Sequence, residues 1–107
     1  MNDVVTTVDY ALFAQAFPFH IVVDARLQIV QYGPSLAKLK LGIATGALFS
    51  EIFEIARPSI EPSYEAIIET ADAGFLIACR NHPIQFRYQV LHDQQHKRLF
   101  FVGSPAF

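Results

Sequence analysis

The segment 17–34 restricts the possible folds of this chain more than any other stretch of its sequence. Two runs rich in β-branched residues, 20–23 and 27–30, lie on either side of Asp24. A carboxylate at such a corner can accept hydrogen bonds from backbone N–H groups two or so residues further on. Proline residues bound the segment near both ends, and proline cannot donate to a backbone ladder. The pattern therefore predicts an antiparallel hairpin that opens a β-sheet.

The rest of the chain alternates between helical and extended patterns. Three more strands are expected at 75–79, 84–92 and 98–104, with a turn at 93–97 between the last two. Helical segments are expected at about 7–17, 35–41, 49–55 and 61–73. This order predicts an α+β fold: a five-stranded antiparallel sheet with short helices on one face and an N-terminal helix.

Residues that favour helix ends support the first and last of these helices. Thr6 and Asp9 have the S/T-x-x-D spacing of a capping box at the start of the first helix. Pro62 suits the first turn of the last helix, and Gly74 suits its left-handed C-terminal cap.

Length and composition indicate one domain with more apolar residues than its core needs. A chain of 107 residues has the size of a single domain, which we divide into the N-terminal helix at about 7–17 and a core at about 18–105. Apolar residues make up 52% of it and charged residues 17%, against about 25% charged in an average domain. Such an excess of apolar surface is typical of a chain that packs against a partner.

Charge and sequence patterning exclude several classes of function. The net charge is −2 without a basic stripe, which argues against a nucleic-acid ligand. The single Cys79 cannot form an internal disulfide and fits a reducing compartment. The N-terminus does not resemble a signal peptide, and no uncharged apolar run approaches the ~18 residues of a membrane helix. We therefore expect a cytoplasmic protein that does not contact a membrane.

The last predicted strand is apolar on both of its faces, whereas the middle helices can cover only one face of the sheet. The N-terminal helix is the expected cover for the other face, either on its own sheet or across a second copy. In the second case the contact is isologous and the assembly is a two-fold homodimer. The expected dimer interface consists of Val8, Leu12, Phe13, Phe17, Phe100 and Val102.

The candidate site residues have simpler structural explanations. His20 needs only one backbone acceptor to be a structural residue. His92 and His96 have H-x-x-x-H spacing, which chelates zinc from one helix face, but here they flank a turn. Cys79 is expected to be a small buried hydrophobe. No catalytic triad, phosphate loop or carboxylate pair is found, so we expect no catalytic residues, no metal and no cofactor.

Four blocks that follow one another in a fixed order cover nearly the whole chain. They are FPFHIVVD (17–24), IVQYGPSL (29–36), FEIARPSIEPSYEAI (53–67) and LFFVGSP (99–105). Together they resemble the PAS-like domain that accompanies haem-nitric-oxide-binding (H-NOX) sensors in soluble guanylate cyclases and bacterial sensor histidine kinases. The resemblance implies a PAS-like fold, dimerisation and relay of a gas-binding signal. Family members continue into a coiled coil and a catalytic domain, so we expect this chain to be part of a longer sensor protein.

These observations favour a non-catalytic dimerisation and signal-relay module, with an H-NOX sensor and a kinase or cyclase output domain as partners. The alternative is a sensor domain that binds haem, flavin or a metabolite between its sheet and helices. A third hypothesis is a module that docks on a separate H-NOX protein. The sequence leaves open the output domain, the gas that is sensed, the contents of the cavity and the register of the last strand.

Overall fold

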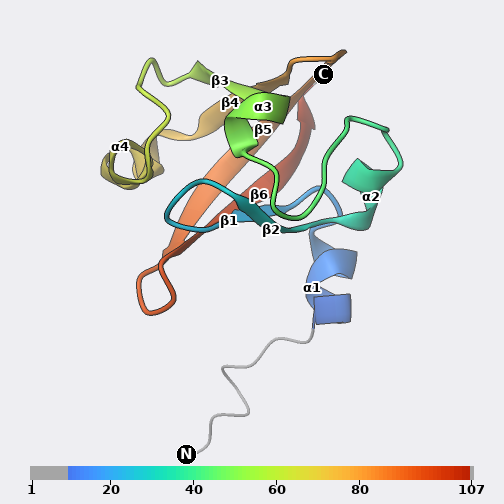
Figure 1. The fold of residues 1–107 in the computed structure, drawn as a ribbon, viewed down its shortest axis with the longest axis horizontal. Coiled ribbons are helices and arrows are strands. Elements are labelled where there is room, and N and C mark those ends of the chain that lie inside the picture. Colours follow the sequence, from blue (N-terminus) through green and yellow to red (C-terminus); the bar gives the residue numbers. More distant parts are fainter. Residues whose placement is uncertain (1–9, 107) are drawn as a thin grey trace, which may run out of the picture.

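The computed structural model describes residues 10–106, which form an antiparallel sheet with short helices packed against it (Figure 1). The strands are β1 (Ile21–Val23), β2 (Ile29–Tyr32), β3 (Phe53–Arg57), β4 (Phe75–Cys79), β5 (His82–Asp93) and β6 (Arg98–Ala106). The helices are α1 (Tyr10–Ala16), α2 (Pro34–Ala37), α3 (Phe49–Ile52), α4 (Tyr64–Glu69) and the 3₁₀-helix η2 (Ala71–Ala73). The strand order across the sheet is β2-β1-β6-β5-β4-β3, and all neighbours are antiparallel.

The hairpin predicted from the segment 17–34 is present as β1 and β2. The Asp24 carboxylate accepts hydrogen bonds from the backbone N–H groups of Arg26 at 2.9 Å and Gln28 at 3.0 Å. Leu27 closes the corner with a φ of 62°, a left-handed conformation that carries a steric cost for leucine. The two bonds to Asp24 help to hold the chain in this turn, so the prediction for this corner is confirmed.

The sheet has six strands, and the prediction of five was wrong. The segment 49–55 was expected to be helical, but only its first four residues form α3. The chain then continues as β3, in which Ile55 pairs with Ile77 of β4. The spacing of Phe49, Ile52 and Phe53 fits a continuous helix as well as a helical turn followed by a strand. Hydrophobic periodicity alone therefore could not distinguish the two structures. Pairing with the otherwise open edge of β4 decides for the strand.

The helix expected at 61–73 is also shorter than predicted. Ser63 is its N-cap, and the Ser63 hydroxyl accepts a hydrogen bond from the Ala66 backbone N–H at 3.1 Å. Pro62 therefore lies before the helix and not in its first turn. After Thr70 the chain tightens into η2 and leaves through Gly74, whose φ of 74° fits the expected left-handed position.

The remaining helices are short. The helix expected at 35–41 covers only Pro34–Ala37. The described part of the N-terminal helix is Tyr10–Ala16, and the rest of the predicted start, with Thr6 and Asp9, lies outside the described residues. Within residues 10–106, no helix has the length and apolarity that crossing a membrane requires.

The core between the sheet and the helices α2, α3 and α4 is filled with aromatic rings. Phe49 of α3 stacks on Phe101 of β6, with ring centroids 5.0 Å apart, and lies 5.1 Å from Phe53. Phe75 and Tyr88 meet Phe101 edge-on at 6.1 and 5.9 Å. Aromatic pairs in this geometry add stabilisation to their large buried area. The phenylalanines thus occupy the space in which a PAS-like cavity was considered.

Two glycines are required because backbone segments approach closely. A Cβ atom on Gly33 would collide with the carbonyl of Pro18, and one on Gly103 would collide with the carbonyl of Arg87. Gly33 lies where the chain leaves β2, and Gly103 lies in β6 opposite Tyr88 of the neighbouring strand β5. The GP and GSP elements of the sequence blocks are therefore explained by packing of backbone against backbone.

Candidate interaction surface

The face of the sheet that points away from α2, α3 and α4 is partly covered by α1. Phe13 of α1 packs on Phe100 of β6, with ring centroids 5.8 Å apart. Phe100 points away from the core, because its neighbours Leu99 and Phe101 are buried inside it and strand residues alternate. Val22, the partner of Phe100 in β1, is also buried. The described part of the N-terminal helix therefore contacts its own sheet on this outer face.

Three large apolar side chains remain exposed around this contact. Leu12 on α1 is 62% exposed, Phe17 just after α1 is 39% exposed, and Leu91 of β5 is 48% exposed. The Phe17 ring lies 5.1 Å from that of Phe13, and Leu91 pairs with Phe100 across β5 and β6. We call these five residues, Leu12, Phe13, Phe17, Leu91 and Phe100, the apolar patch. Exposed apolar groups gathered in this way are typical of an interaction surface.

The structure brings together most of the residues predicted for an interface. Phe13, Phe17 and Phe100 are in contact, and Leu12 lies on the same helix. Val102 is on the same face of β6 as Phe100, but only 8% of it is exposed. Val8 lies outside the described residues. Their role in dimerisation stays a prediction.

Leu91 was not among the residues predicted for the interface, because the residues that alternate with it on its side of the strand are polar. The alternate residues before it on the outer side of β5 are Gln85, Arg87 and Gln89, and all three are exposed. Leu91 is the next residue on this same side of the strand. An apolar residue in a polar phase is the signal that would have identified it.

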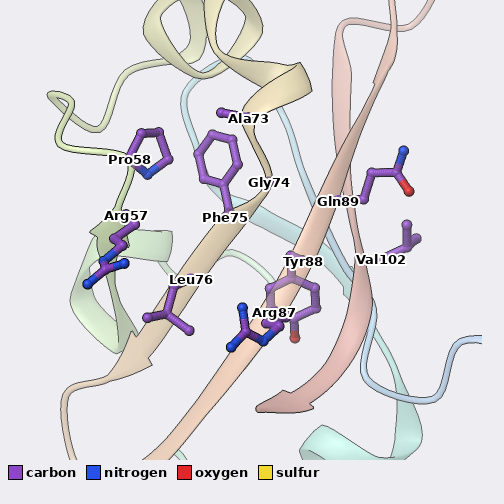
Figure 2. A pocket seen from close by; sticks show the side chains of 10 residues that line it. All are labelled: Arg57, Pro58, Ala73, Gly74, Phe75, Leu76, Arg87, Tyr88, Gln89 and Val102. Atoms are coloured by element: carbon purple, nitrogen blue, oxygen red, sulfur yellow. The ribbon is translucent and has the colours of Figure 1, made fainter.

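A groove of about 840 Å³ lies further along the same outer face, toward β3 (Figure 2). Its lining includes the backbone and side chains of η2, β3, β4, β5 and β6, with Arg57, Leu76, Arg87, Gln89 and Val102 on the outer side of the sheet. We call it the arginine groove. Val102 belongs both to this groove and to the strand that carries Phe100, so the groove continues the apolar patch.

The two arginines of the groove have no ion-pair partner among residues 10–106. Arg57 and Arg87 are both exposed. Arg80, by contrast, has Glu54 at 3.8 Å and donates a 2.6 Å hydrogen bond to the Ser50 carbonyl. The groove thus presents two cationic groups that the described part of the chain does not neutralise.

His20 is buried between α1 and the sheet and has a structural role, as expected. Its Nδ1–H donates to the Phe17 carbonyl at 2.9 Å, and its Nε2 accepts from the Gln31 side-chain amide at 2.8 Å. The Phe13 ring meets it edge-on at 4.7 Å. Burial lowers the pKa of His20, and the hydrogen bond to Phe17 opposes this shift only in part. The neutral imidazole therefore fastens the end of α1 to the hairpin.

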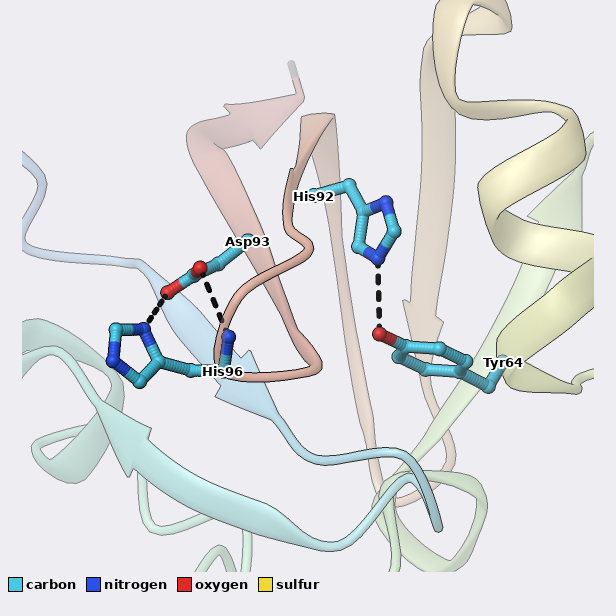
Figure 3. A network of polar contacts seen from close by, with 4 residues as sticks. All are labelled: Tyr64, His92, Asp93 and His96. Carbon is cyan, nitrogen blue, oxygen red and sulfur yellow. Dashed lines mark hydrogen bonds and ion pairs between the residues drawn. The ribbon is translucent and has the colours of Figure 1, made fainter.

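His92 and His96 do not converge on a common point (Figure 3). The Tyr64 hydroxyl and His92 Nε2 form a hydrogen bond of 3.0 Å, whereas His96 Nδ1 lies 2.8 Å from the Asp93 carboxylate. The hydrogen bond from His96 lowers the pKa of Asp93. Within the described part of the chain, no three His, Cys, Asp or Glu side chains are grouped in a way that would hold a metal ion. The H-x-x-x-H spacing has a structural explanation in this hairpin.

A smaller pocket and the cysteine offer little to a ligand. The pocket between α3, β3 and the loop at Ile60 has a volume of about 220 Å³, below the roughly 300–1,000 Å³ of typical ligand sites. Cys79 is half-buried, and burial raises its pKa to about 11. Its thiol therefore stays protonated at neutral pH and is a poor nucleophile.

The geometry defines a small α+β module whose most prominent surface feature is an outer sheet face with an apolar patch and a cationic groove. The model of the heme NO binding associated family matches residues 6–85, and the chain belongs to this family. The recognition of an H-NOX-associated domain from the four sequence blocks is thereby confirmed.

Relatives of the chain include several guanylate cyclase subunits. It is 25% identical over 104 residues to human guanylate cyclase soluble subunit alpha-2, which covers 88% of this chain. It is 27% identical over 107 residues to the rat soluble subunit alpha-1, covering 90% of this chain, and 28% identical over 105 residues to a Drosophila melanogaster head-specific guanylate cyclase, covering 87%. The chain spans only 14 to 16% of the length of these three relatives.

Proposed function

We propose that this domain is a non-catalytic, PAS-like dimerisation and relay module of a gas-sensing protein. In this proposal it forms a homodimer through α1 and the outer sheet face. It then transmits the state of an H-NOX sensor to an output domain, which is a guanylate cyclase or a histidine kinase. A cytoplasmic location is part of the proposal.

The observation that carries the proposal is the apolar patch. Leu12 and Leu91 are 62% and 48% exposed, although each lies next to the contact of Phe13 with Phe100. A patch that surrounds a packed helix–sheet contact can be covered by the same patch of a second copy, which closes a two-fold dimer. Burial of such apolar groups is the main favourable term in association.

Family membership supports the relay part of the proposal. The relatives are guanylate cyclase subunits of several animals, and the family is described as associated with haem NO binding. A dimeric module between a sensor and an output domain can pass a change in the relative position of its two copies to the output pair. The histidine kinase output rests on the sequence resemblance alone.

A small-molecule sensor is supported less well. That function needs an enclosed volume between the sheet and the helices, and stacked rings around Phe49 and Phe101 occupy this region. The pocket that borders Phe49 and Phe53 is only about 220 Å³. An absorption spectrum of the protein purified without added cofactor tests for haem and flavin.

Sedimentation equilibrium tests the dimer. The wild-type chain is expected to dimerise, and Leu91→Asp is expected to raise the dimer Kd by on the order of 100-fold. The substitution occurs twice in a two-fold interface, and each loss of about 1.4 kcal/mol changes Kd tenfold. Leu48→Asp is the matched control, because Leu48 is 40% exposed but lies at the start of α3, outside the patch. A wild-type chain that remains monomeric at high concentration would refute the proposal.

A further inference from the structure

A β-bulge in β3 turns Arg57 toward the outer face of the sheet. From Ile55 to Arg57 the strand β3 advances by two residues while its partner β4 advances by one, so Ala56 is an extra residue. Ile55 packs on the core, and strict alternation brings the second residue after it to the same inner side. The extra residue shifts the alternation by one position. Arg57 therefore lies on the outer face, beside Leu76 and exposed to solvent (Figure 2).

The bulge completes a row of three side chains across three strands. Arg57 of β3 pairs with Leu76 of β4, and Leu76 pairs in turn with Arg87 of β5. Figure 2 shows the Leu76 side chain between those of the two arginines. With neighbouring strands ~4.8 Å apart, the Cα atoms of the two arginines are about 10 Å from each other. The outer face therefore has a fixed order of cation, apolar group and cation.

The two arginines of the row have no structural partner in the described part of the chain. Within residues 10–106, the side chains of Arg57 and Arg87 form no ion pair and no hydrogen bond. Arg80, which directly follows β4, has both, with the Glu54 carboxylate and the Ser50 carbonyl. Since like charges repel one another, an anion bound between or beside Arg57 and Arg87 lowers the electrostatic energy of the row.

The groove around the row has the size and the lining of a small-molecule site. Its volume of about 840 Å³ lies within the roughly 300–1,000 Å³ of typical ligand sites. Leu76, Pro58 and Val102 form the apolar part of the lining. A guanidinium group binds a carboxylate through two parallel N–H···O bonds. A complementary molecule therefore has one carboxylate for each arginine and an apolar segment between them.

We propose that the arginine groove binds a linear dicarboxylate, with one carboxylate on Arg57, the other on Arg87 and the hydrocarbon chain on Leu76. The separation of the two arginines sets the length of the ligand. With C–C bonds of about 1.5 Å, an extended eight-carbon dicarboxylate holds its carboxyl carbons roughly 9 Å apart, and a four-carbon one roughly 4 Å. Each groove is built by one chain, so the inference does not rest on the proposed dimer.

NMR titration with carboxylates of different length tests the site. Suberate, the eight-carbon dicarboxylate, is expected to shift the side-chain Nε–H signals of both Arg57 and Arg87. It is expected to bind about fivefold more tightly than octanoate, which has the same number of carbons and one carboxylate. Fivefold corresponds to about 1 kcal/mol, the upper value for an exposed ion pair. Succinate, which is too short to reach both arginines, is expected to bind about fivefold more weakly than suberate.

Substitutions of the arginines assign the contacts. Arg57→Gln and Arg87→Gln are each expected to lower the affinity for suberate about fivefold and to remove its advantage over octanoate. Lysine at either position keeps the charge without the bidentate geometry, so Arg57→Lys and Arg87→Lys are expected to give intermediate affinities. Arg80→Gln is the matched control, because Arg80 is paired with Glu54 outside the groove. It is expected to leave the affinity unchanged.

The folding of each variant is verified by its backbone amide spectrum, which is expected to be unchanged because Arg57 and Arg87 are exposed. Should a glutamine variant unfold, the lysine variant at the same position and the comparison of ligand lengths on the wild type still test the inference.

Several outcomes would overturn the inference. One is a wild-type chain that does not bind suberate at millimolar concentration, and another is suberate binding that both glutamine variants retain in full. Octanoate, succinate or inorganic phosphate binding as tightly as suberate would also overturn it, since the groove then does not recognise two separated carboxylates. A preference for suberate that both glutamine substitutions abolish supports it.

Discussion

At the scale of single residues, backbone contacts explain the most constrained positions of the sequence blocks. Because Gly103 of β6 has no Cβ atom, the Arg87 carbonyl of the neighbouring strand β5 can approach it closely. Gly103→Ala is expected to destabilise the domain by about 1–3 kcal/mol, because the added methyl group forces the two strands apart. Urea unfolding measures this loss.

The neighbouring serine is the control for that substitution. Ser104 is exposed, and Ser104→Ala is expected to change the free energy of unfolding by no more than about 0.5 kcal/mol. Equal effects of the two substitutions would contradict the explanation by close approach.

His20 gives the domain a pH dependence whose sign follows from its burial. Its folded-state pKa is lowered, so between that value and the unfolded value of about 6.5 the unfolded chain binds more protons. Stability is therefore expected to fall as the pH drops below about 6.5. Two of the side chains that contact His20, those of Phe13 and Gln31, do not titrate.

A substitution isolates this contribution. An asparagine amide can replace the Nδ1–H donor to the Phe17 carbonyl without titrating. His20→Asn is expected to be less stable than wild type at neutral pH but to lose less stability between pH values of about 7 and 5. Parallel pH profiles from thermal unfolding would contradict this role of His20.

At the scale of elements, local caps determine where α4 begins. Ser63 holds the first turn through its hydroxyl, in place of the proline start that the sequence favoured. Ser63→Ala is expected to cost about 1 kcal/mol of stability. Ser59→Ala, in the exposed loop before it, is expected to be neutral. Urea unfolding of both variants distinguishes the cap from a general effect of losing a hydroxyl.

At the scale of the whole molecule, symmetry of the proposed dimer can be measured. In a two-fold interface each chain contributes Leu91 once, so a heterodimer of wild type and Leu91→Asp carries half of the damage. Its Kd is expected to rise about tenfold, where the variant homodimer loses on the order of 100-fold. Mixing experiments with one fluorescently labelled chain measure both values. A heterodimer as weak as the variant homodimer would contradict the two-fold arrangement.

The sequence by itself determined those features that depend on local chemistry. The corner at Asp24, the glycine at 74 and the strands around 84–92 and 98–104 follow from turn chemistry and alternation, which act between near neighbours. The four sequence blocks were sufficient to recognise the family.

Only the tertiary structure decided the sixth strand and the outer surface. The segment that became β3 fits helix and strand equally well, and its choice depends on the free edge of β4, which is more than a dozen residues away. Likewise, Leu91 and the row of Arg57, Leu76 and Arg87 become neighbours of other strands only when the register is set. Register depends on long-range pairing. Sequence patterns could therefore show that the chain has more apolar residues than its core needs, but they could not locate the groove.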